Sequence, residues 1–442
     1  MEAIRKRAAD VEATYRMAEG VYLLGSLEKG LTLYNQQVRA HNLVWALWEL
    51  RRAKKEVLGR VAVVGGGAAG LTATAGLLSR FSENVEVTLF ERYWDICALQ
   101  QGADTRWLHP RIYNWPAVGS RAPGASLPLL NWSEGRASDV ARRLSESFGR
   151  YCDQYASDPS ALTIQIDVKN LQLDVETRVI RWEGVKAQQV DSFFCPLEEA
   201  KSDVRNFEII ILAAGFGIER NVHGSATESY WRNEQLAQPR LDGDRRTWLI
   251  SGYGDGALVD LCRLTIERFR QDTILYELFG ADLTAIEVGL LTELDRGQKG
   301  EPLNLVLRRI SQRQLEAACD KLRPRLRKDT VVILNARGRS GQNKALDDIL
   351  GAGTSVLNRM LTFLLHECGA FKLQFNELDQ CAASNHVKAE NIVRRNGTDT
   401  MALLQGIIPE FITVRKKIER IKADQAQSAE PMWEPGSFPI LN

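Results

Sequence analysis

The sequence predicts an α/β fold: a doubly wound parallel sheet with an inserted β-meander, followed by a largely helical C-terminal part. Three observations predict it. A strand, a glycine-rich turn and a helix follow one another over residues 60–80. Short alternating segments with charged turns between them occupy residues 160–206, as expected of an antiparallel meander. The run Ile209–Leu212 is apolar at every position, as a central strand buried on both faces must be.

The first glycine-rich turn carries the spacing G-x-G-x-x-G, and it comprises Gly65, Gly66, Gly67, Ala68, Ala69 and Gly70. The first glycine permits a tight turn, the second lets a pyrophosphate approach the backbone, and the third lets the helix pack closely on the sheet. The N–H groups and the dipole at the helix start favour phosphate. Glu91, 21 residues after Gly70, is placed to accept hydrogen bonds from a ribose hydroxyl. The alternative is a turn that only packs a βαβ unit.

The run Val-Val-Gly-Gly-Gly-Ala-Ala-Gly-Leu-Thr-Ala within residues 60–91 resembles the FAD-binding start of the FAD/NAD(P)-dependent oxidoreductase superfamily. In that superfamily the motif binds the ADP half of FAD, and a small meander precedes the last strand of the domain. Ala213-Ala214-Gly215 resembles the Ala-Thr-Gly turn of the superfamily, so Ala214 and Gly215 are expected to lie against the cofactor. Two adjacent glycines usually follow the ribose acid, whereas this chain reads Ala-Leu-Gln-Gln-Gly there.

The length of 442 residues allows two or three domains. We expect a helical arm over residues 1–56, with a helix over 33–52 that packs on the core or contacts a partner or a second copy. An FAD-binding Rossmann-type domain with the meander is expected over 57–280. A mainly helical region is expected over 281–442.

The stretch that follows Glu91 is dense in polar and aromatic residues and is interrupted by prolines, so it is not a regular helix. We expect it to form the wall of the flavin site, the alternative being a structural loop pinned by aromatic side chains. Arg92 and Arg106 are candidates for cofactor contacts, and Arg106 or Arg111 could instead hold a substrate carboxylate. His109 is the candidate acid or base, and Arg106 and Tyr113 complete the catalytic candidates.

A second glycine-rich turn, Ser251-Gly-Tyr-Gly-Asp-Gly-Ala, allows two interpretations. In the first, Gly252, Gly254 and Ala257 form a nicotinamide-dinucleotide loop, and Glu277 takes the ribose hydroxyl if residues 273–277 form a strand. In the second, Asp255 contacts the ribityl chain of FAD.

No arginine cluster follows Gly254 at a spacing suited to a 2′-phosphate, which favours NADH over NADPH under the first interpretation. Arg337 and Arg339, in a polar loop after the strand at 330–334, are solvated charges or anion contacts.

The composition of the chain argues against several classes of partner, location and cysteine site. The 57 basic and 56 acidic residues leave a net charge of +1, so no nucleic acid or anionic membrane is expected as a partner. No apolar run is long enough to span a bilayer, and the start does not resemble a signal peptide, so we expect a cytoplasmic protein. None of the seven cysteines forms a C-x-x-C or C-x-x-x-x-C pair, which argues against a redox disulfide and a zinc site.

The function expected from these residues and from the resemblance is an FAD-dependent oxidoreductase acting on a small molecule, with NAD(P)H as reductant under the first interpretation of the second turn. An amine or amino-acid oxidase needs FAD but no second dinucleotide. A dinucleotide-binding regulatory or assembly subunit without turnover is the alternative from another class.

Overall fold

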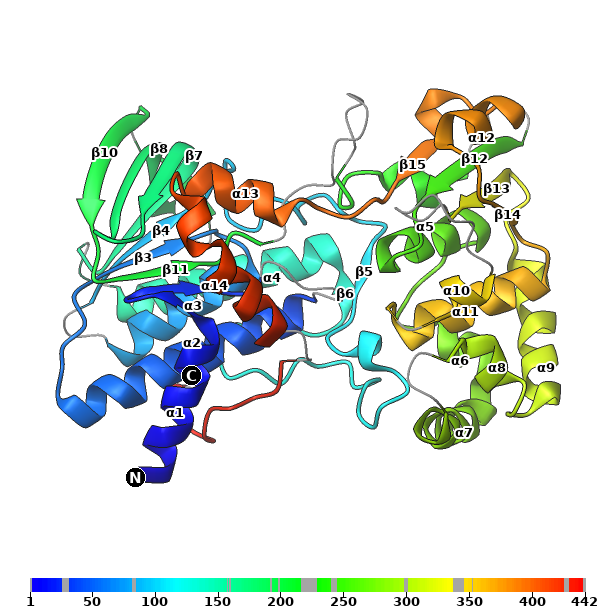
Figure 1. Ribbon diagram of the computed structural model, residues 1–442, viewed down its shortest axis with the longest axis horizontal. Coiled ribbons are helices and arrows are strands. Elements are labelled where there is room, and N and C mark those ends of the chain that lie inside the picture. The colour runs from blue at the N-terminus through cyan, green and yellow to red at the C-terminus, as the bar shows by residue number, and fades with distance from the viewer. Residues whose placement is uncertain are drawn as a thin grey trace.

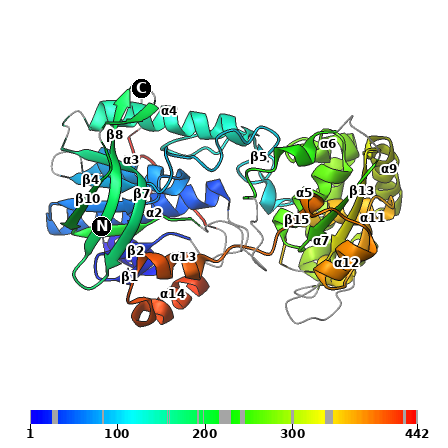
Figure 2. The same ribbon diagram turned by 90° about the horizontal axis from the view of Figure 1, so that it is seen from above.

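The structure, a computed structural model, has two lobes, each built on its own sheet (Figures 1 and 2). The chain passes from the first lobe to the second between β11 (Ile209–Leu212) and β12 (Arg246–Ser251), and it returns between β15 (Ile392–Arg394) and α13 (Thr400–Ile407). The structure describes residues 2–25, 32–81, 85–156, 158, 160–190, 193–197, 199–215, 229–239, 245–297, 301–336, 346–351, 353–424 and 429–439.

The first lobe holds, within the described residues, a nine-stranded sheet in the order β1-β2-β11-β3-β4-β7-β8-β10, with β9 paired to β8. β2, β11, β3, β4 and β7 are parallel to one another, and β8, β9 and β10 extend the sheet as an antiparallel meander. The other strands of this sheet are β1 (Arg16–Ala18), β2 (Val21–Leu23), β3 (Arg60–Val64), β4 (Glu86–Phe90), β7 (Leu162–Asp174), β8 (Val179–Val190), β9 (Phe193–Pro196) and β10 (Lys201–Asn206). The predicted fold class is confirmed.

Helices cover both faces of this sheet. Val61 and Val63 of β3 face a core shared with α1 (Glu2–Tyr15), α2 (Leu33–Lys54), α3 (Ala68–Arg80) and α4 (Ala137–Tyr155). Ala62 and Val64 face the opposite core, which α13 and α14 (Phe411–Asp424) close. A parallel sheet buried on both faces explains why these strands are apolar at nearly every position.

The second lobe is built on four parallel strands in the order β14-β13-β12-β15. Its further elements are β13 (Thr330–Asn335), β14 (Lys372–Gln374), α5 (Asp255–Thr265), α6 (Ile274–Phe279), α7 (Leu283–Arg296), α8 (Leu303–Leu307), α9 (Gln312–Leu322), α10 (Leu346–Ile349), α11 (Val356–Glu367) and α12 (Leu378–Ser384). The chain leaves β12 toward β13 on one side, and β15 later pairs on the other side. β12 therefore stands at the point where the strand order reverses, which is where open α/β sheets bind ligands.

Residues 92–136 contribute to both lobes. Leu129 and Trp132 lie in the core of the first lobe, whereas Ile112 and Trp115 lie in the core of the second. The segment contains only the short strands β5 (Trp107–Leu108) and β6 (Gly135–Arg136) and a single 3-10 turn before α4. The prediction that its prolines prevent a regular helix is confirmed, and the segment connects the two cores.

The sheets group the chain differently from the domain ranges expected from the sequence. β1 and β2 lie within residues 1–56 and pair into the first sheet, so this arm is not only helical. β12 and α5 lie within 57–280 but belong to the second lobe, and α13 and α14 lie within 281–442 but pack on the first. The reason is physical: strands of three residues show no readable alternation, and the sheet that a strand joins depends on partners far away in the sequence.

Two further expectations are corrected. Residues 274–279 form the helix α6, so the strand at 273–277 that the first interpretation required for Glu277 is not formed; Glu277 instead pairs with Arg325. Two of the short alternating segments expected within residues 160–206, Ile164–Val168 and Leu171–Asp174, form one bulged strand, β7, because Asp167 and Asn170 adopt positive φ values of 50° and 53°. Asp and Asn enter this left-handed region more readily than other residues do, so the strand continues through them.

The predicted helix at 33–52 is confirmed as α2, which is covered by α1 and α3 of its own chain. Trp45 is 1% exposed, and Trp48 packs against Phe81 with ring centroids 5.0 Å apart. The larger apolar side chains of α2 therefore serve the core, and a contact with a partner through this arm stays a prediction.

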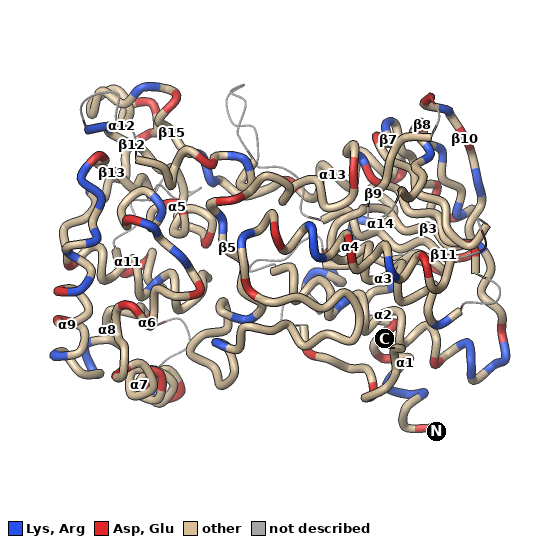
Figure 3. The backbone as a smooth tube through the Cα atoms, turned by 180° about the vertical axis from the view of Figure 1, so that it is seen from behind, with Lys and Arg blue, Asp and Glu red and all other residues tan. Residues whose placement is uncertain are grey.

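Within the described part of the chain, no helix is long and apolar enough to cross a membrane, and no group of three or more His, Cys, Asp or Glu side chains could hold a metal ion. Basic and acidic positions are interspersed over both lobes (Figure 3).

Candidate functional site

The first glycine loop, residues 65–70, leaves the carboxyl end of β3 and begins α3. Gly65 has φ +117°, and a Cβ there would lie 2.3 Å from the carbonyl oxygen of Ala213. The Gly65 N–H donates to the carbonyl oxygen of Phe90, the last residue of β4, at 2.7 Å. Since no other residue tolerates both the dihedral angle and the close approach, glycine is required here.

Gly67 is the N-cap of α3, with φ −82° and ψ −177°, and no side chain caps this helix start. A Cβ on Gly67 would meet nothing within 4 Å, so the backbone there faces open space. The helix ladder starts with the Leu71 N–H, which donates to the Gly67 carbonyl oxygen at 3.0 Å. The N–H groups of the preceding residues have no partner inside the helix and are therefore suited to phosphate oxygens.

Gly70 closes the loop, because a Cβ there would lie 1.8 Å from the Gly65 carbonyl oxygen. Ala68 and Ala69, the first two residues of α3, lie between Gly67 and Gly70 and bring the helix start against the turn. Gly65 and Gly70 are thus required by the fold itself. Gly67 is left free for a ligand.

Glu91 follows β4 directly and is 7% exposed. Its carboxylate accepts hydrogen bonds from the N–H of Gly66 at 2.6 Å and of Tyr93 at 2.9 Å. Burial raises the pKa of Glu91 above its ordinary value, and these N–H donors oppose the rise. Each oxygen keeps a further lone pair, so hydroxyl donors from a ribose would relieve the remaining desolvation.

Three other first-lobe candidates lie beside this loop. Ala214 and Gly215 follow β11 and are half-buried, and the Cα of Ala214 lies 3.1 Å from the place where a Gly65 Cβ would stand. Arg92 is exposed next to Glu91, and its guanidinium lies 5.1 Å from the ring centroid of Tyr93. The structure therefore gathers these predicted cofactor residues at one edge of the sheet.

The second glycine loop, residues 252–257, repeats this geometry at the carboxyl end of β12. Gly252 has φ +124°, and a Cβ there would lie 2.3 Å from the carbonyl oxygen of Arg395. The Gly252 N–H donates to the carbonyl oxygen of Asn335, the last residue of β13, at 3.0 Å. Gly252, Arg395 and Asn335 thus take the places that Gly65, Ala213 and Phe90 have in the first lobe.

Gly254 is the N-cap of α5, with φ −78° and ψ 175°, and no side chain caps this helix either. A Cβ on Gly254 would again meet nothing within 4 Å. The Leu258 N–H donates to the Gly254 carbonyl oxygen at 3.1 Å, and the buried Ala257 stands where the first loop has its third glycine. The second loop therefore presents the same kind of uncapped helix start.

Asp255 is engaged with the second lobe. One of its carboxylate oxygens accepts from the backbone N–H of Ser355 at 2.9 Å and from the side-chain amide of Asn358 at 2.7 Å. It thereby fixes the start of α11 to the start of α5. This is a structural use of the carboxylate that the sequence does not reveal.

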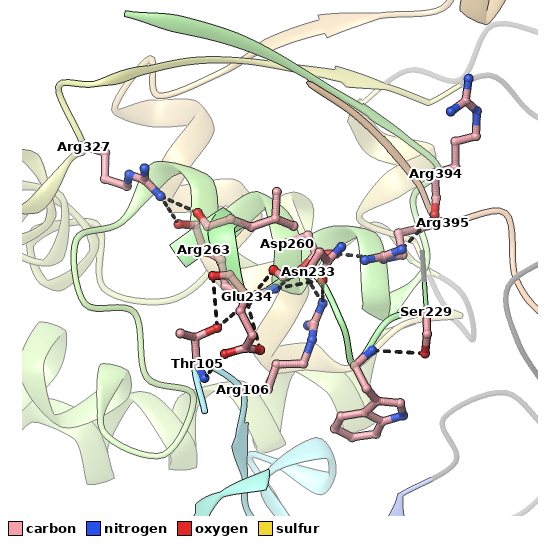
Figure 4. A network of polar contacts seen from close by, with 12 residues as sticks. Thr105, Arg106, Ser229, Asn233, Glu234, Asp260, Arg263, Arg327, Arg394 and Arg395 are labelled. Carbon is pink, nitrogen blue, oxygen red and sulfur yellow. Dashed lines mark hydrogen bonds and ion pairs between the residues drawn. The ribbon is translucent and has the colours of Figure 1, made fainter. Parts of the chain in front are cut away.

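The two lobes are tied together by a buried ionic cluster, which we call the junction cluster: Asp260, Arg106, Arg263 and Arg395 (Figure 4). Asp260, on α5, is 0% exposed. One of its oxygens accepts from Arg106 and Arg263 at 2.9 Å each, and the other accepts from Arg395 at 2.8 Å. Burial alone would raise the pKa of Asp260, but the three guanidinium groups override it and hold the pKa well below its usual range.

Arg106 is the member of this cluster that comes from the segment shared by the two lobes, residues 92–136. Its carbonyl oxygen accepts from the Ala137 N–H at the start of α4, and its guanidinium carbon lies 3.4 Å from the ring centroid of Tyr230. Its Nη2 also donates to the side chain of Asn233, whereas Nε and Nη1 are buried without a hydrogen-bond partner. The predicted candidate therefore lies at the contact between lobes, and two of its donors are buried there without a hydrogen-bond partner.

His109 and Tyr113 also lie at this contact, on the connecting segment. His109 is 5% exposed; its Nδ1 accepts the N–H groups of Arg111 and Ile112, and its Nε2 lies 3.3 Å from a Glu134 oxygen. Burial lowers the pKa of His109, which favours the neutral ring. Burial also raises the pKa of Tyr113 well above its usual value, so its hydroxyl stays protonated. Catalytic roles for both stay predictions.

Sequence reasoning missed Asp260, Arg263, Arg395 and Tyr230. A signal for the first two was present, because a charged pair three residues apart in an otherwise apolar helix is expected to be buried and paired. Arg337 and Arg339, the candidate anion contacts, lie outside the described residues.

Comparisons with known proteins give little beyond this geometry. No family model matches the chain, and no curated protein matches it. The chain is similar to the solved structure of an NAD-dependent persulfide reductase from A. fulgidus, with 11% identity and a TM-score of 0.30 over 76% of this chain and 45% of that one. It is also similar to a water-forming NADH oxidase from Lactobacillus brevis bound to NADH, with 12% identity and a TM-score of 0.24 over 72% of this chain and 46% of that one.

The matches span less than half of either of those proteins, and at these TM-scores neither activity carries over to this chain. The order β3–α3–β4, then the meander, then β11 is the order that the resemblance to the FAD/NAD(P)-dependent oxidoreductase superfamily implied. The resemblance therefore holds at the level of the fold.

Proposed function

We propose that the protein is an FAD-dependent oxidoreductase that a nicotinamide dinucleotide reduces, and that it acts on a small molecule. The observation that carries the proposal is the repetition of one loop geometry. Gly65 and Gly252 have φ values of +117° and +124°, and each packs closely against the backbone at the end of a neighbouring strand. Each loop then continues to a helix start that no side chain caps. Two such loops are suited to the pyrophosphates of two dinucleotides.

In this proposal FAD occupies the first loop. The open space at Gly67 would admit the pyrophosphate, and Glu91 would accept the ribose hydroxyls. When bound, the flavin supplies the redox chemistry; the residues of the chain hold it and exclude water. Side chains between the lobes, among them Arg106 and Tyr113, would line the substrate site. There the two donors of Arg106 that have no partner would bind an anionic group of the substrate.

The nicotinamide dinucleotide is assigned to the second loop for two reasons. The loop lies on a separate sheet at the reversal of strand order, and Asp255 already holds the start of α11. The other interpretation, in which Asp255 contacts the ribityl chain of FAD, would require this engaged carboxylate to serve a second partner. An amine or amino-acid oxidase would leave the second loop without a ligand, so the repeated geometry favours it less. A regulatory or assembly subunit without turnover would keep both ligands but show no reduction.

The first prediction is that the purified protein contains stoichiometric FAD and that a nicotinamide dinucleotide bleaches its flavin absorption under anaerobic conditions. The measurement is the visible spectrum before and after titration with NADH and, separately, with NADPH.

Three outcomes separate the candidates. Flavin without bleaching by either dinucleotide supports an oxidase or a subunit without turnover. Bleaching of bound flavin supports the proposal. A colourless protein of intact fold that takes up no FAD contradicts every flavoprotein assignment.

A further inference from the structure

The second loop differs from the first at the residue that meets the adenosine ribose, and we infer that it binds the 2′-phosphorylated dinucleotide, NADP(H), at least as well as NAD(H). The inference rests on the proposed function, because it names the form of the dinucleotide that the second loop takes. It replaces the expectation of NADH, which was based on the absence of an arginine cluster at a suitable spacing after Gly254.

Backbone hydrogen bonds fix which residue of the second lobe corresponds to Glu91. In the first lobe, Gly65 donates its N–H to the carbonyl oxygen of Phe90. The next residue, Glu91, donates its own N–H to the carbonyl oxygen of Gln165 on β7 at 2.7 Å. In the second lobe, Gly252 donates its N–H to the carbonyl oxygen of Asn335. The next residue, Ala336, donates its own N–H to the carbonyl oxygen of Gln374 on β14 at 3.0 Å. Ala336 therefore occupies the place of Glu91.

Glu277, which the sequence suggested for this role, lies on α6 and pairs with Arg325. At the end of β13, the last strand residue, Asn335, donates its side-chain amide to the carbonyl oxygen of Asn376 at 3.0 Å. Ala336 itself is 0% exposed and ends in a methyl group. Residues 335 and 336 thus offer the ribose no carboxylate.

The chemical consequence follows from what the acid does in such loops. A carboxylate accepts both ribose hydroxyls and repels a 2′-phosphate, so it selects the dinucleotide that lacks this phosphate. With alanine at this position, the acceptor is lost for NAD(H) and the repulsion is lost for NADP(H). The first lobe retains the acid, which agrees with FAD, since the adenosine ribose of FAD carries a free 2′-hydroxyl.

The test measures binding rather than turnover. The oxidised forms NADP⁺ and NAD⁺ are titrated by calorimetry into the FAD-loaded full chain, where neither can reduce the flavin. We expect a dissociation constant for NADP⁺ equal to or below that for NAD⁺. Tighter binding of NAD⁺ by more than about tenfold, which corresponds to ~1.4 kcal/mol, overturns the inference.

The failure of the proposed function looks different. If neither dinucleotide binds, the second site does not exist, and the inference falls with it. If NADP⁺ or NAD⁺ binds but the protein holds no FAD, only the assignment of the first loop fails, and the ratio of the two affinities still decides this inference.

The matched variants act on Ala336. Ala336→Glu restores a carboxylate at this place, so we expect NADP⁺ to lose at least about tenfold in affinity relative to NAD⁺, because the new charge repels the 2′-phosphate. Ala336→Ser is the control that adds a small polar group without charge, and it should leave the ratio unchanged. Circular dichroism and thermal melting close to wild type report that each variant folds. A ratio that does not move in a folded Ala336→Glu protein overturns the placement of the ribose, and the wild-type ratio decides the preference without any variant.

Discussion

Asp260→Asn should destabilise the folded protein by about 3–5 kcal/mol, the range for removing one partner of a buried ionic cluster. The amide keeps nearly the shape of the carboxylate but removes the negative charge that Arg106, Arg263 and Arg395 share. Three guanidinium groups would then remain in a site of 0–3% side-chain exposure. The measurement is the free energy of unfolding by denaturant, and the junction between the lobes should be the region that loses protection from hydrogen exchange.

A matched control exists on the surface of α4. Glu146 accepts from Arg142 at 2.9 Å, and the two side chains are 37% and 59% exposed. Glu146→Gln should change the free energy of unfolding by less than about 1 kcal/mol, because water screens such pairs. If Asp260→Asn costs no more than this control, the three arginines are balanced by other groups, and Asp260 does not hold the junction together.

The contribution of Asp260 to the free energy of unfolding should also depend on pH, and it should decrease at acidic pH. A carboxyl group whose pKa is depressed in the folded protein contributes stability above its unfolded value of about 3.9 and loses that contribution as the pH falls toward the folded value. The difference in unfolding free energy between wild type and Asp260→Asn should therefore stay constant from about pH 5 to 8 and shrink below about pH 4. Denaturation curves at several pH values measure it. A difference that grows on acidification would contradict the assigned charge state.

How much of this could be predicted from the sequence depends on how local the determinants are. The first glycine loop and Glu91 belong to one strand–helix–strand unit of about thirty residues, so spacing alone predicts where they meet. In the second lobe the helices α5 to α9 separate the loop from β13, so the usual spacing pointed to Glu277 on α6 instead of Ala336.

The junction cluster could not be predicted for a related reason. Arg106 and Asp260 are 154 positions apart, and Arg395 is 135 positions from Asp260. No periodicity or spacing connects such residues, because their meeting depends on how two lobes pack. The sequence did indicate that the segment around Arg106 carries unusual chemistry. Its partners, and its position between two cores, follow only from the structure.

The remaining prediction compares substitutions at Gly67 and Gly254, the N-cap residues of α3 and α5. Gly67→Val and Gly254→Val each add a Cβ that meets nothing within 4 Å beyond the adjoining residues, so the fold without ligand should persist in both. Each side chain would occupy the space that a pyrophosphate needs, so affinity should fall at least about a hundredfold, ~2.7 kcal/mol. Gly67→Val should lose FAD. Gly254→Val should keep FAD and lose both nicotinamide binding and reduction of the flavin.

Gly70→Val is the contrasting variant, since its Cβ would lie 1.8 Å from the Gly65 carbonyl oxygen and must disturb the loop itself. Circular dichroism and thermal melting should separate it from the two N-cap variants, which are expected to melt close to wild type. FAD content and dinucleotide titrations then complete the comparison. Loss of FAD in Gly254→Val, with the fold intact, would show that the second loop contacts the flavin cofactor and would return Asp255 to the ribityl chain. Full retention of both ligands in both variants would leave the two loops as structural turns, because a phosphate that lay against either backbone could not share that space with a valine side chain.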